Sequence, residues 1–423
     1  MADTLHPLRV ALLSYRSKPH CGGQGVYVRH LSRELAALGH RVEVFSGQPY
    51  PELDDGVILR PVPSLDLYND ADPFRTPPLS AWRGPVDALE VATMWTAGFP
   101  EPLTFSLRAL AELRRRRDDF DVVHDNQTLG YGMLGLRALG LPLTTTIHHP
   151  IAIDRRIELE SVKGAAKLSK RRWYGFVRMQ RRVARRLDPV ITVSRASADD
   201  IRREFGVARE HLRVIPLGVD TSCFRPVEPA ARVPGRIVAI ASADSPLKGV
   251  GTLLRAVAKL ATEREVGLTI VGRVNPGGVT DRLIDDLSLR GRVRFVSGID
   301  DAELGALLGS AQVAVVPSLY EGFSLPAVEA MACATPLVVS RAGALPEVVG
   351  ADGEAALLVT PGDVEDLAAR LGALLDDPEL RARLGSGGWR RVQERFTWRA
   401  VAVATADCYA QTVTRARTRS APS

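Results

Sequence analysis

The chain has 423 residues, of which 45% are hydrophobic and 25% are charged, a composition typical of globular proteins. Its 55 Lys and Arg residues against 49 Asp and Glu residues give a net charge of +6. That excess suits an anionic small molecule or an anionic membrane surface, but no basic stripe with interleaved aromatics indicates nucleic-acid binding. The length exceeds what one hydrophobic core usually organises, so we expect two domains.

The compartment is predicted from two further features. Neither a disulfide framework nor a zinc site is expected, because the four cysteines lack C-x-x-C spacing (Cys21, Cys223, Cys333 and Cys408). The N-terminus has no cationic segment followed by an apolar core, and no apolar run reaches the length of a membrane span. We therefore predict a cytoplasmic protein, with any membrane contact peripheral and on the inner face.

The first half of the chain predicts a parallel sheet. A strand over 8–14, a helix over 26–39 and a strand over 41–46 form a βαβ unit. Further strands are predicted at 121–125, 143–148 and 189–194. Residues 50–105 are rich in proline and dispersed aromatics, and we expect an irregular insertion that caps the first domain and shapes substrate choice.

The second half repeats the pattern after a proline-rich linker at 224–235. Strands are predicted at 236–242, 267–272, 292–297, 313–318 and 336–340, with helices at 249–262, 279–289, 300–310, 325–333, 363–374 and 378–394. A frayed basic tail is expected from residue 415. The fold class is therefore α/β, with two doubly wound parallel-sheet domains facing a cleft, and ligands should bind outside the carboxyl ends of the strands.

The stretch SLYEGFSLPAVEAMAC (318–333) lies at such a strand end. Its glutamates, Glu321 and Glu329, could be an acid/base pair, a metal site or surface charge. The helix should begin near Leu325, so free backbone N–H groups of Phe323, Ser324 and Leu325 would form a phosphate site.

Several motifs in order resemble those of the retaining family 4 glycosyltransferases, which have the GT-B fold. They are the E-x(7)-E element from Glu321 to Glu329, GALPEVVG (343–350), GGQGVYVRHLSRELAALGHRVEVF (22–45), DVVHD (121–125), the TVS strand end at Ser194, IPLGVD (215–220) and FTWRAV (396–401). The resemblance covers nearly the whole chain outside residues 50–120. It implies an N-terminal acceptor-binding domain (1–218), a C-terminal nucleotide-sugar domain (219–395) and a last helix (396–413) that packs back on the first domain.

The resemblance also implies an activity, the transfer of a hexose from a UDP- or GDP-sugar to a hydroxyl acceptor with retention of configuration. Glu329 would bind the ribose hydroxyls, backbone at Gly322 to Leu325 the diphosphate and sugar oxygens, and Glu321 the transferred sugar. Lys248 would neutralise the leaving group. Neither a cofactor nor a metal is expected, because the lysine and the helix N-terminus already supply positive charge. The acceptor, whether lipid-linked, glycan or small molecule, is left open.

One position departs from the family pattern. An arginine is usual five residues before the lysine, but Ala243 stands there. Arg273, just after the 267–272 strand, is the candidate substitute, and a solvated loop arginine is the equally weighted alternative.

In the first domain, Gly22, Gly23 and Gly25 would let backbone approach the donor closely, or would simply serve a tight turn. His148 ends a strand where the family has a histidine near the donor sugar, although His149 beside it leaves the choice open. The acceptor side is assigned Asp125 and Asn126, with a helix cap as the alternative for them.

A cationic helix is predicted over 167–187, with Trp173, Phe176, Val177, Val183 and Leu187 on one face. It would either bind anionic lipid or pack on the sheet, and packing is favoured. The RRRR run (114–117) carries the same two alternatives. Two other functions with this fold stay open, a sugar-nucleotide epimerase and a catalytically silent sugar-nucleotide-binding protein.

Overall fold

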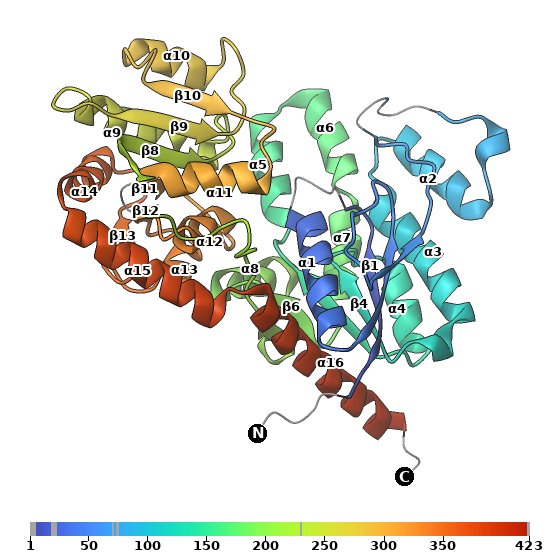
Figure 1. Ribbon diagram of the computed structural model, residues 1–423. Helices are drawn as coiled ribbons and strands as arrows, with labels where there is room; N and C mark the ends of the chain where they lie inside the picture. Colours follow the sequence, from blue (N-terminus) through green and yellow to red (C-terminus); the bar gives the residue numbers. More distant parts are fainter. Residues whose placement is uncertain (1–5, 18–22, 70–71, 73–75, 229–230, 421–423) are drawn as a thin grey trace. The chain divides into compact units, whose positions relative to one another are not determined.

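In the computed structural model, the described residues are 6–17, 23–69, 72, 76–228 and 231–420. They form two compact units (Figure 1). Unit 1 contains residues up to Val193, Ser197–Ile215 and residues from Val401 onward. Unit 2 contains Ser194–Ala196 and Pro216–Ala400. Each unit is built on its own parallel sheet, which confirms the predicted fold class at the level of the single domain.

Unit 1 has a seven-stranded parallel sheet in the order β3-β2-β1-β4-β5-β6-β7. Its strands are β1 (Arg9–Ser14), β2 (Arg41–Ser46), β3 (Ile58–Pro61), β4 (Val122–Asn126), β5 (Leu143–Ile147), β6 (Val190–Thr192) and β7 (Leu212–Val214). All five residues of both β4 and β5 are buried, as expected for strands covered by helices on both faces. The strand order reverses between β1 and β4, which makes their carboxyl ends the switch point where ligands bind in such sheets.

Helices cover both faces of this sheet (Figure 1). One face packs against α3 (Glu101–Arg115), α4 (Tyr131–Ala138), α7 (Phe176–Ala184) and α8 (Arg195–Phe205). The other face carries the buried polar residues of β4 and β5. It lies against α1 (Gly23–Ala37) and, through Tyr409, against α16 (Trp398–Ser420). Two further helices, α5 (Ala152–Ser161) and α6 (Gly164–Trp173), precede α7.

The predicted irregular insertion at 50–105 is more regular than expected. It contributes the edge strand β3, the helix α2 (Pro85–Trp95) and the start of α3. The short, half-exposed sequence of β3 carries no clear strand pattern. The segment has a small core of its own, in which Leu65, Leu67, Val91 and Met94 are buried.

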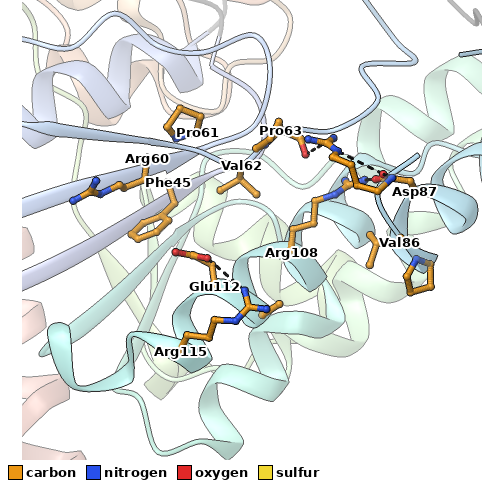
Figure 2. A pocket seen from close by; sticks show the side chains of 14 residues that line it. Phe45, Arg60, Pro61, Val62, Pro63, Val86, Asp87, Arg108, Glu112 and Arg115 are labelled. Carbon is orange, nitrogen blue, oxygen red and sulfur yellow. Dashed lines mark hydrogen bonds and ion pairs between the residues drawn. The ribbon is translucent and has the colours of Figure 1, made fainter. Parts of the chain in front are cut away.

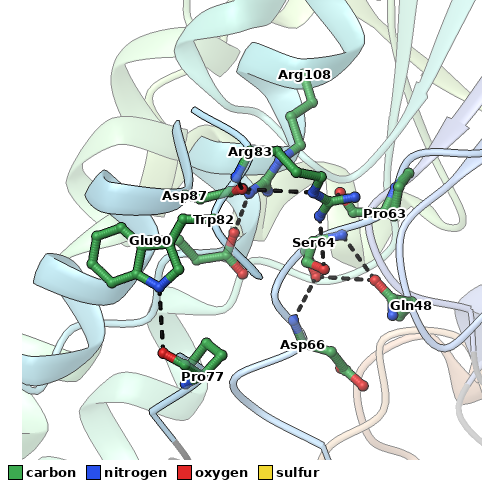
Figure 3. Close-up of polar contacts among 10 residues, drawn as sticks. All are labelled: Gln48, Pro63, Ser64, Asp66, Pro77, Trp82, Arg83, Asp87, Glu90 and Arg108. Carbon is green, nitrogen blue, oxygen red and sulfur yellow. Dashed lines mark hydrogen bonds and ion pairs between the residues drawn. The ribbon is translucent and has the colours of Figure 1, made fainter. Parts of the chain in front are cut away.

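A polar cluster, buried at Asp87 and Glu90 and exposed at Arg83, ties this segment to α3 (Figure 3). The Arg108 guanidinium on α3 donates to the carboxylates of Asp87 and Glu90 on α2. The Arg83 guanidinium donates to the carbonyl oxygens of Pro63 and Ser64, at 3.1 Å in both cases. Burial raises the pKa of Glu90, against the lowering effect of Arg108. These contacts fix the path of the chain around α2.

Unit 2 has a six-stranded parallel sheet in the order β10-β9-β8-β11-β12-β13. Its strands are β8 (Val233–Ile240), β9 (Gly267–Val271), β10 (Val293–Val296), β11 (Ala311–Val316), β12 (Leu337–Ser340) and β13 (Leu357–Val359). The order reverses between β8 and β11, so their carboxyl ends form the switch point of this unit.

The unit 2 helices lie on both faces of the sheet (Figure 1). The main apolar cluster joins the sheet to α9 (Val250–Leu260), α10 (Val279–Asp286) and α14 (Val364–Asp376). The second face carries α11 (Asp301–Ser310), α12 (Leu325–Ala332), α13 (Leu345–Val349) and α15 (Pro378–Arg395).

Four sequence predictions need correction. Strand β8 begins at Val233, inside the predicted linker at 224–235. The predicted helix at 167–187 is two helices, α6 and α7, because a turn at Tyr174 and Gly175 separates them. The tail expected to fray from residue 415 continues α16 to Ser420. The sequence patterns predict neither β13, which has three residues, nor α13, which has five, because both are too short to show a periodic pattern.

The favoured alternative for the 167–187 segment, packing on the sheet, holds for α7 but not for α6. Helix α7 buries Val177 and Val183 against the sheet, whereas α6 buries none of its described residues. In the 114–117 run, Arg116 is mostly buried, donates to Glu43 and Asp119, and lies over the rings of Phe45 and Phe120. Within the part of the chain that the structure describes, no helix is long and apolar enough to cross a bilayer.

Candidate functional site

The stretch that carries the two glutamates lies at the unit 2 switch point, as predicted. Strand β11 ends at Val316, a loop follows, and α12 begins at Leu325. Ser324 is the N-cap; its hydroxyl accepts from the N–H of Ala327 at 3.4 Å, and its φ is 91°. Among the described contacts, the backbone N–H groups of Phe323 to Leu325 are not used, so they remain free for an anion at the positive helix end.

Lys248 and Glu321 form an ion pair at this switch point. Lys248 lies in a short turn after β8, and its Nζ is 2.7 Å from Glu321 Oε1. The same carboxylate oxygen accepts a hydrogen bond from the Ser318 hydroxyl, also at 2.7 Å. The side chain of Glu321 is 11% exposed and that of Lys248 is 34% exposed. A cation and a carboxylate therefore share one partly exposed position, held by a serine that sequence analysis did not single out.

Two glycines fix the loop that presents Glu321. At Gly249, with φ of 64°, a Cβ would lie 2.0 Å from the carbonyl oxygen of Pro317. At Gly343, with φ of 54°, a Cβ would lie 2.1 Å from the carbonyl oxygen of Glu321. The same carbonyl accepts from the N–H of Ala344 at 2.9 Å. Only glycine fits at either side of this loop.

Glu329 lies one turn inside α12, and its side chain is partly exposed. Burial raises the pKa of its carboxyl to about 8, and the carboxylate of Asp301 adds to the rise. The group is therefore mostly protonated near neutral pH in the unliganded protein, which makes a metal-binding role for it unfavourable. No group of three or more metal-ligand side chains gathers among the described residues.

The two residues named at the family departure lie close to the same sheet edge. Ala243 follows β8 and is buried, with its carbonyl oxygen accepting from the Thr280 hydroxyl at 3.0 Å. Arg273 follows β9, the neighbour of β8, and is exposed. Arg273 is thus one strand away from Lys248, so its side chain is free to reach an anion.

In unit 1, His148 lies directly after β5, and its ring is bonded to the end of β4. The Nε2–H donates to Asn126 Oδ1 at 2.8 Å, which leaves Nδ1 without a proton. Burial lowers the pKa of His148 to about 4, so the ring is neutral at pH 7. The Tyr27 ring packs edge-on against it at 4.6 Å. Asn126 thus orients the histidine and is itself buried.

Asp125 does not reach the surface as an acceptor contact requires. Its side chain is fully buried, and its oxygens accept from the N–H groups of Thr128 and Leu129 and from the Thr145 hydroxyl. These bonds hold the turn after β4 and do not cap α4, whose N-cap is Gly130, so the geometry supports neither the helix-cap alternative nor a direct acceptor contact. Asn126 likewise acts on His148 rather than at an exposed surface.

Gln127 was not predicted, and it holds the His148–His149 backbone. Its Oε1 accepts from the N–H of His148 at 2.7 Å, and its Nε2 donates to the carbonyl of His149 at 2.9 Å. Its own φ is 57°, uncommon for a residue other than glycine. Gln180 on α7 supports the same turn by donating to the Gln127 and Thr128 carbonyls. No sequence signal marks such a conformation in advance.

Two of the three predicted glycines belong to α1. Gly23 is the first residue of α1 and Gly25 lies within it, whereas Gly22 is outside the described residues. His149, the alternative to His148, instead lies 3.2 Å from the Asp154 carboxylate on α5. Of the two histidines, His148 is the one bonded at the end of β4.

A cavity of about 590 Å³ lies elsewhere in unit 1, between β3, α2 and α3 (Figure 2). Its lining combines the apolar side chains of Val62 and Val86 with Arg108, Glu112 and Arg115. Three strands separate β3 from β5 in the sheet, so this cavity is distinct from the surroundings of His148.

Comparison with known families decides the class of the protein. The family described as Glycosyl transferases group 1 matches residues 227–391, and the one described as Glycosyltransferase Family 4 matches residues 21–222. The chain belongs to the family 4 glycosyltransferases.

Relatives cover this glycosyltransferase almost end to end. It is 60% identical to the MMP alpha-(1->4)-mannosyltransferase of Mycolicibacterium hassiacum, over 96% of this chain and 99% of the relative. It is 31% identical to D-inositol 3-phosphate glycosyltransferase 2 of Catenulispora acidiphila, over 96% of each chain.

Solved structures show that the transferase has the GT-B fold. Sucrose-phosphate synthase from Thermosynechococcus elongatus matches with a TM-score of 0.70 at 24% identity, covering 96% of this chain and 100% of that one. Anabaena Alr3699/HepE in complex with UDP matches with a TM-score of 0.68 at 18% identity, with the same coverage.

Proposed function

We propose that this glycosyltransferase moves a mannosyl residue from a nucleoside diphosphate sugar to a sugar hydroxyl, with retention of configuration. The single observation that carries the site assignment is the Lys248–Glu321 pair beside the start of α12, at the switch point of unit 2. The sugar and the linkage are proposed from the 60% identical relative, whose name gives an α-(1→4)-mannosyl product. An α product from an α-linked donor is formed with retention.

Each donor group then has a partner. The free N–H groups at residues 323–325 and the ammonium of Lys248 hold the diphosphate, on which negative charge grows as the sugar leaves. Glu329 accepts from the ribose hydroxyls, and Glu321 contacts the transferred sugar. Arg273 is proposed as the second cation, and transfer needs no metal.

For unit 1, the proposal assigns His148 to the transferred sugar. Its neutral ring, with Nε2–H bonded to Asn126, presents Nδ1 as an acceptor for a sugar hydroxyl. Gly23 at the start of α1 is kept as a place where backbone approaches the donor. The acceptor proton leaves with the phosphate oxygen in the same-face mechanism that the family resemblance implies.

The test is product formation with a panel of donors. UDP-mannose, GDP-mannose, UDP-glucose and GDP-glucose are incubated with methyl α-mannoside or a manno-oligosaccharide, with and without EDTA. We expect one mannosyl donor to give an α-(1→4) product, seen in the anomeric NMR signals, at a rate that EDTA does not change. Exclusive glucosyl transfer, or a β product, would refute the proposal.

Substitution tests the proposed second cation. Lys248→Ala should abolish transfer, and Arg273→Ala should raise the donor KM about tenfold, as expected for loss of one charge-assisted contact. An Arg273→Ala enzyme with unchanged turnover and donor KM would remove Arg273 from the site and leave Lys248 as its cation.

A further inference from the structure

A network of buried hydrogen bonds joins four elements of unit 1. Its members, the buried network, are Tyr409 on α16, His124 on β4, Thr146 on β5 and Tyr27 on α1. The Tyr409 oxygen lies 2.6 Å from His124 Nδ1, and the Thr146 oxygen lies 2.7 Å from His124 Nε2. The Tyr27 and Thr146 hydroxyl oxygens are 3.2 Å apart. His124, the histidine of the DVVHD motif, therefore uses both ring nitrogens inside the protein.

The buried network is closed to solvent. His124, Thr146 and Tyr409 are each 0% exposed, and Tyr27 is 3% exposed. Burial lowers the pKa of His124 to about 3, so its ring is neutral near pH 7. Polar groups in such a place cost free energy unless they are hydrogen-bonded, and an apolar side chain would cover the strand without that requirement. A substrate cannot reach these groups, so their use lies in what they hold.

The buried network ends at the ring that packs on His148. The ring centroids of Tyr27 and His148 are 4.6 Å apart, and the two ring planes are at 81° to each other. Such an edge-to-face contact depends on the tilt of both rings. The bond between the Tyr27 and Thr146 hydroxyls fixes the far end of the tyrosine ring. The network therefore sets the tilt that Tyr27 presents to His148.

His148 needs a contact of this kind to present Nδ1 in a fixed direction. Its hydrogen bond from Nε2–H to Asn126 Oδ1 fixes one corner of the imidazole. A hydrogen bond constrains distance and direction at that corner, but it lets the ring rotate about the N–H···O line. Contact with the Tyr27 ring opposes that rotation. Together the two contacts fix the plane of the imidazole, and with it the direction of the Nδ1 lone pair.

We propose that Tyr27 is a positioning residue that fixes the plane of the His148 ring. The other members of the buried network act by holding the Tyr27 hydroxyl. In sugar transfer, Tyr27 orients the Nδ1 that is assigned to a sugar hydroxyl, without touching the sugar itself. The effect on rate thus rests on the proposed function, whereas the orientation of the ring can be measured without any transfer.

The first test removes the hydroxyl and keeps the ring. Tyr27→Phe should lower kcat for sugar transfer about tenfold, as expected when a contact to the reacting sugar is misdirected. The Kd of UDP or GDP should change less than about twofold, because the nucleotide contacts are assigned to unit 2. In a His148→Ala background, Tyr27→Phe should have no further effect on kcat. An equal loss in both backgrounds would overturn the inference, since Tyr27 would then act independently of His148.

Substitutions on β5 supply matched controls. Thr146→Val keeps the shape of the side chain but loses the hydroxyl, so it should lower kcat as Tyr27→Phe does. Thr146→Ser keeps the hydroxyl and should stay close to wild type. Thr144 is equally buried, and its hydroxyl lies 3.3 Å from that of Thr412 on α16, outside the network. Thr144→Val should therefore leave kcat unchanged. A fall of the same size in Thr144→Val would mean that packing alone matters, which contradicts the inference.

A second readout follows His148 without any transfer. In protein labelled with ¹⁵N-histidine, the Nε2–H proton that is bonded to Asn126 gives a low-field NMR signal, identified by its loss in His148→Ala. Tyr27→Phe and Thr146→Val should shift or broaden this signal, and Thr144→Val should leave it in place. An unchanged signal in Tyr27→Phe would overturn the inference, whatever the rates are.

Failure of the proposed function is distinguishable from failure of this inference. Full transfer activity in His148→Ala, with the imidazole signal displaced in Tyr27→Phe, would remove His148 from the sugar site and leave Tyr27 as the residue that positions it. Loss of transfer in His148→Ala, with both rate and signal unchanged in Tyr27→Phe, would keep the proposed function and refute the inference.

Discussion

At the scale of single residues, Lys248 and Glu321 neutralise each other's charge. The ammonium that is proposed to meet a diphosphate is held by a carboxylate at 2.7 Å, and Ser318 holds that carboxylate in turn. A phosphate must therefore compete with Glu321 for the lysine. The competition is modest, because a partly exposed ion pair contributes about 1 kcal/mol.

This competition gives an unusual expectation for Glu321→Gln. The variant should bind UDP or GDP, whichever the donor carries, about fivefold more tightly, since about 1 kcal/mol of competing attraction is removed. Transfer should nevertheless fall at least about a hundredfold, because the contact with the moving sugar is lost. Isothermal titration of the nucleotide and initial rates measure the two effects. Weaker nucleotide binding in Glu321→Gln would mean that the pair does not oppose the phosphate.

Glu329 makes the stability of the protein depend on pH. Its pKa is about 8 in the folded protein against an ordinary value of 4.5, so the folded state binds the proton more tightly than the unfolded state. Its contribution to stability is thus present below pH 4.5 and is lost as pH rises towards 8. Glu329→Gln should melt above wild type at pH 8 and close to it at pH 5. A melting difference that shrinks with rising pH would contradict the raised pKa.

At the scale of elements, one arginine closes the ends of two helices in unit 2. The Arg232 guanidinium donates to the carbonyl oxygens of Gly309 and Ala311 at the end of α11, and of Cys333 and Ala334 just after α12. These are carbonyls that a helix end leaves without partners. Since α12 carries Glu329 and begins at the proposed phosphate site, Arg232 supports the site from its far end.

Arg232→Met should consequently lower the free energy of unfolding by about 3 kcal/mol, because it strands several carbonyls at once. Urea denaturation of the purified variant measures this. Arg232→Lys, which keeps the charge but not the planar fork, should fall between Met and wild type. Equal stability of Met and wild type would show that water replaces the guanidinium without cost.

Helix α6 is the element left for the membrane alternative, since α7 packs on the sheet. Its cations Lys167 and Arg171 accompany Leu168, which is 70% exposed. Lys167→Glu combined with Arg171→Glu should abolish flotation with anionic vesicles at low salt, because attraction of about 1 kcal/mol per cation is reversed. Arg178→Glu on α7 is the matched control. No flotation of wild type would leave α6 as a solvated helix.

The elements also show what sequence patterns could predict. Strands β1, β8 and β11 were found because each contains a continuous apolar run that ends at a turn. The edge strand β3 was not, since half of it faces solvent. Helix and strand ends shifted by one to three residues, where capping depends on tertiary contacts.

The residues of the candidate site likewise fall into those that the sequence predicts and those that it does not. Residues on motifs, such as Lys248 and Glu329, could be placed at a strand end from spacing alone. The roles of Ser318, Gln127 and Asn126 could not, because they depend on side-chain contacts across loops and on a positive φ that the sequence does not announce.

At the scale of the whole molecule, each unit has its own apolar core, and the proposed donor contacts on the diphosphate and ribose all lie in unit 2. A nucleoside diphosphate at a hundred times its Kd should stabilise its unit by about 2.7 kcal/mol. In hydrogen exchange, addition of UDP or GDP should slow exchange in β11 and α12 more than it does in β4 and α4. Equal protection of all four elements would refute the assignment of the nucleotide contacts to unit 2.

The glycines on either side of the Glu321 loop set a limit for enzyme engineering. Because Gly249 and Gly343 touch the loop backbone itself, a library that randomises them would yield mostly misfolded clones, whatever donor is offered. Side chains at these two positions would push the loop backbone aside. A change of donor range in this scaffold must come from exchanging side chains on a fixed backbone, and the positions to vary are those that point away from the two glycines.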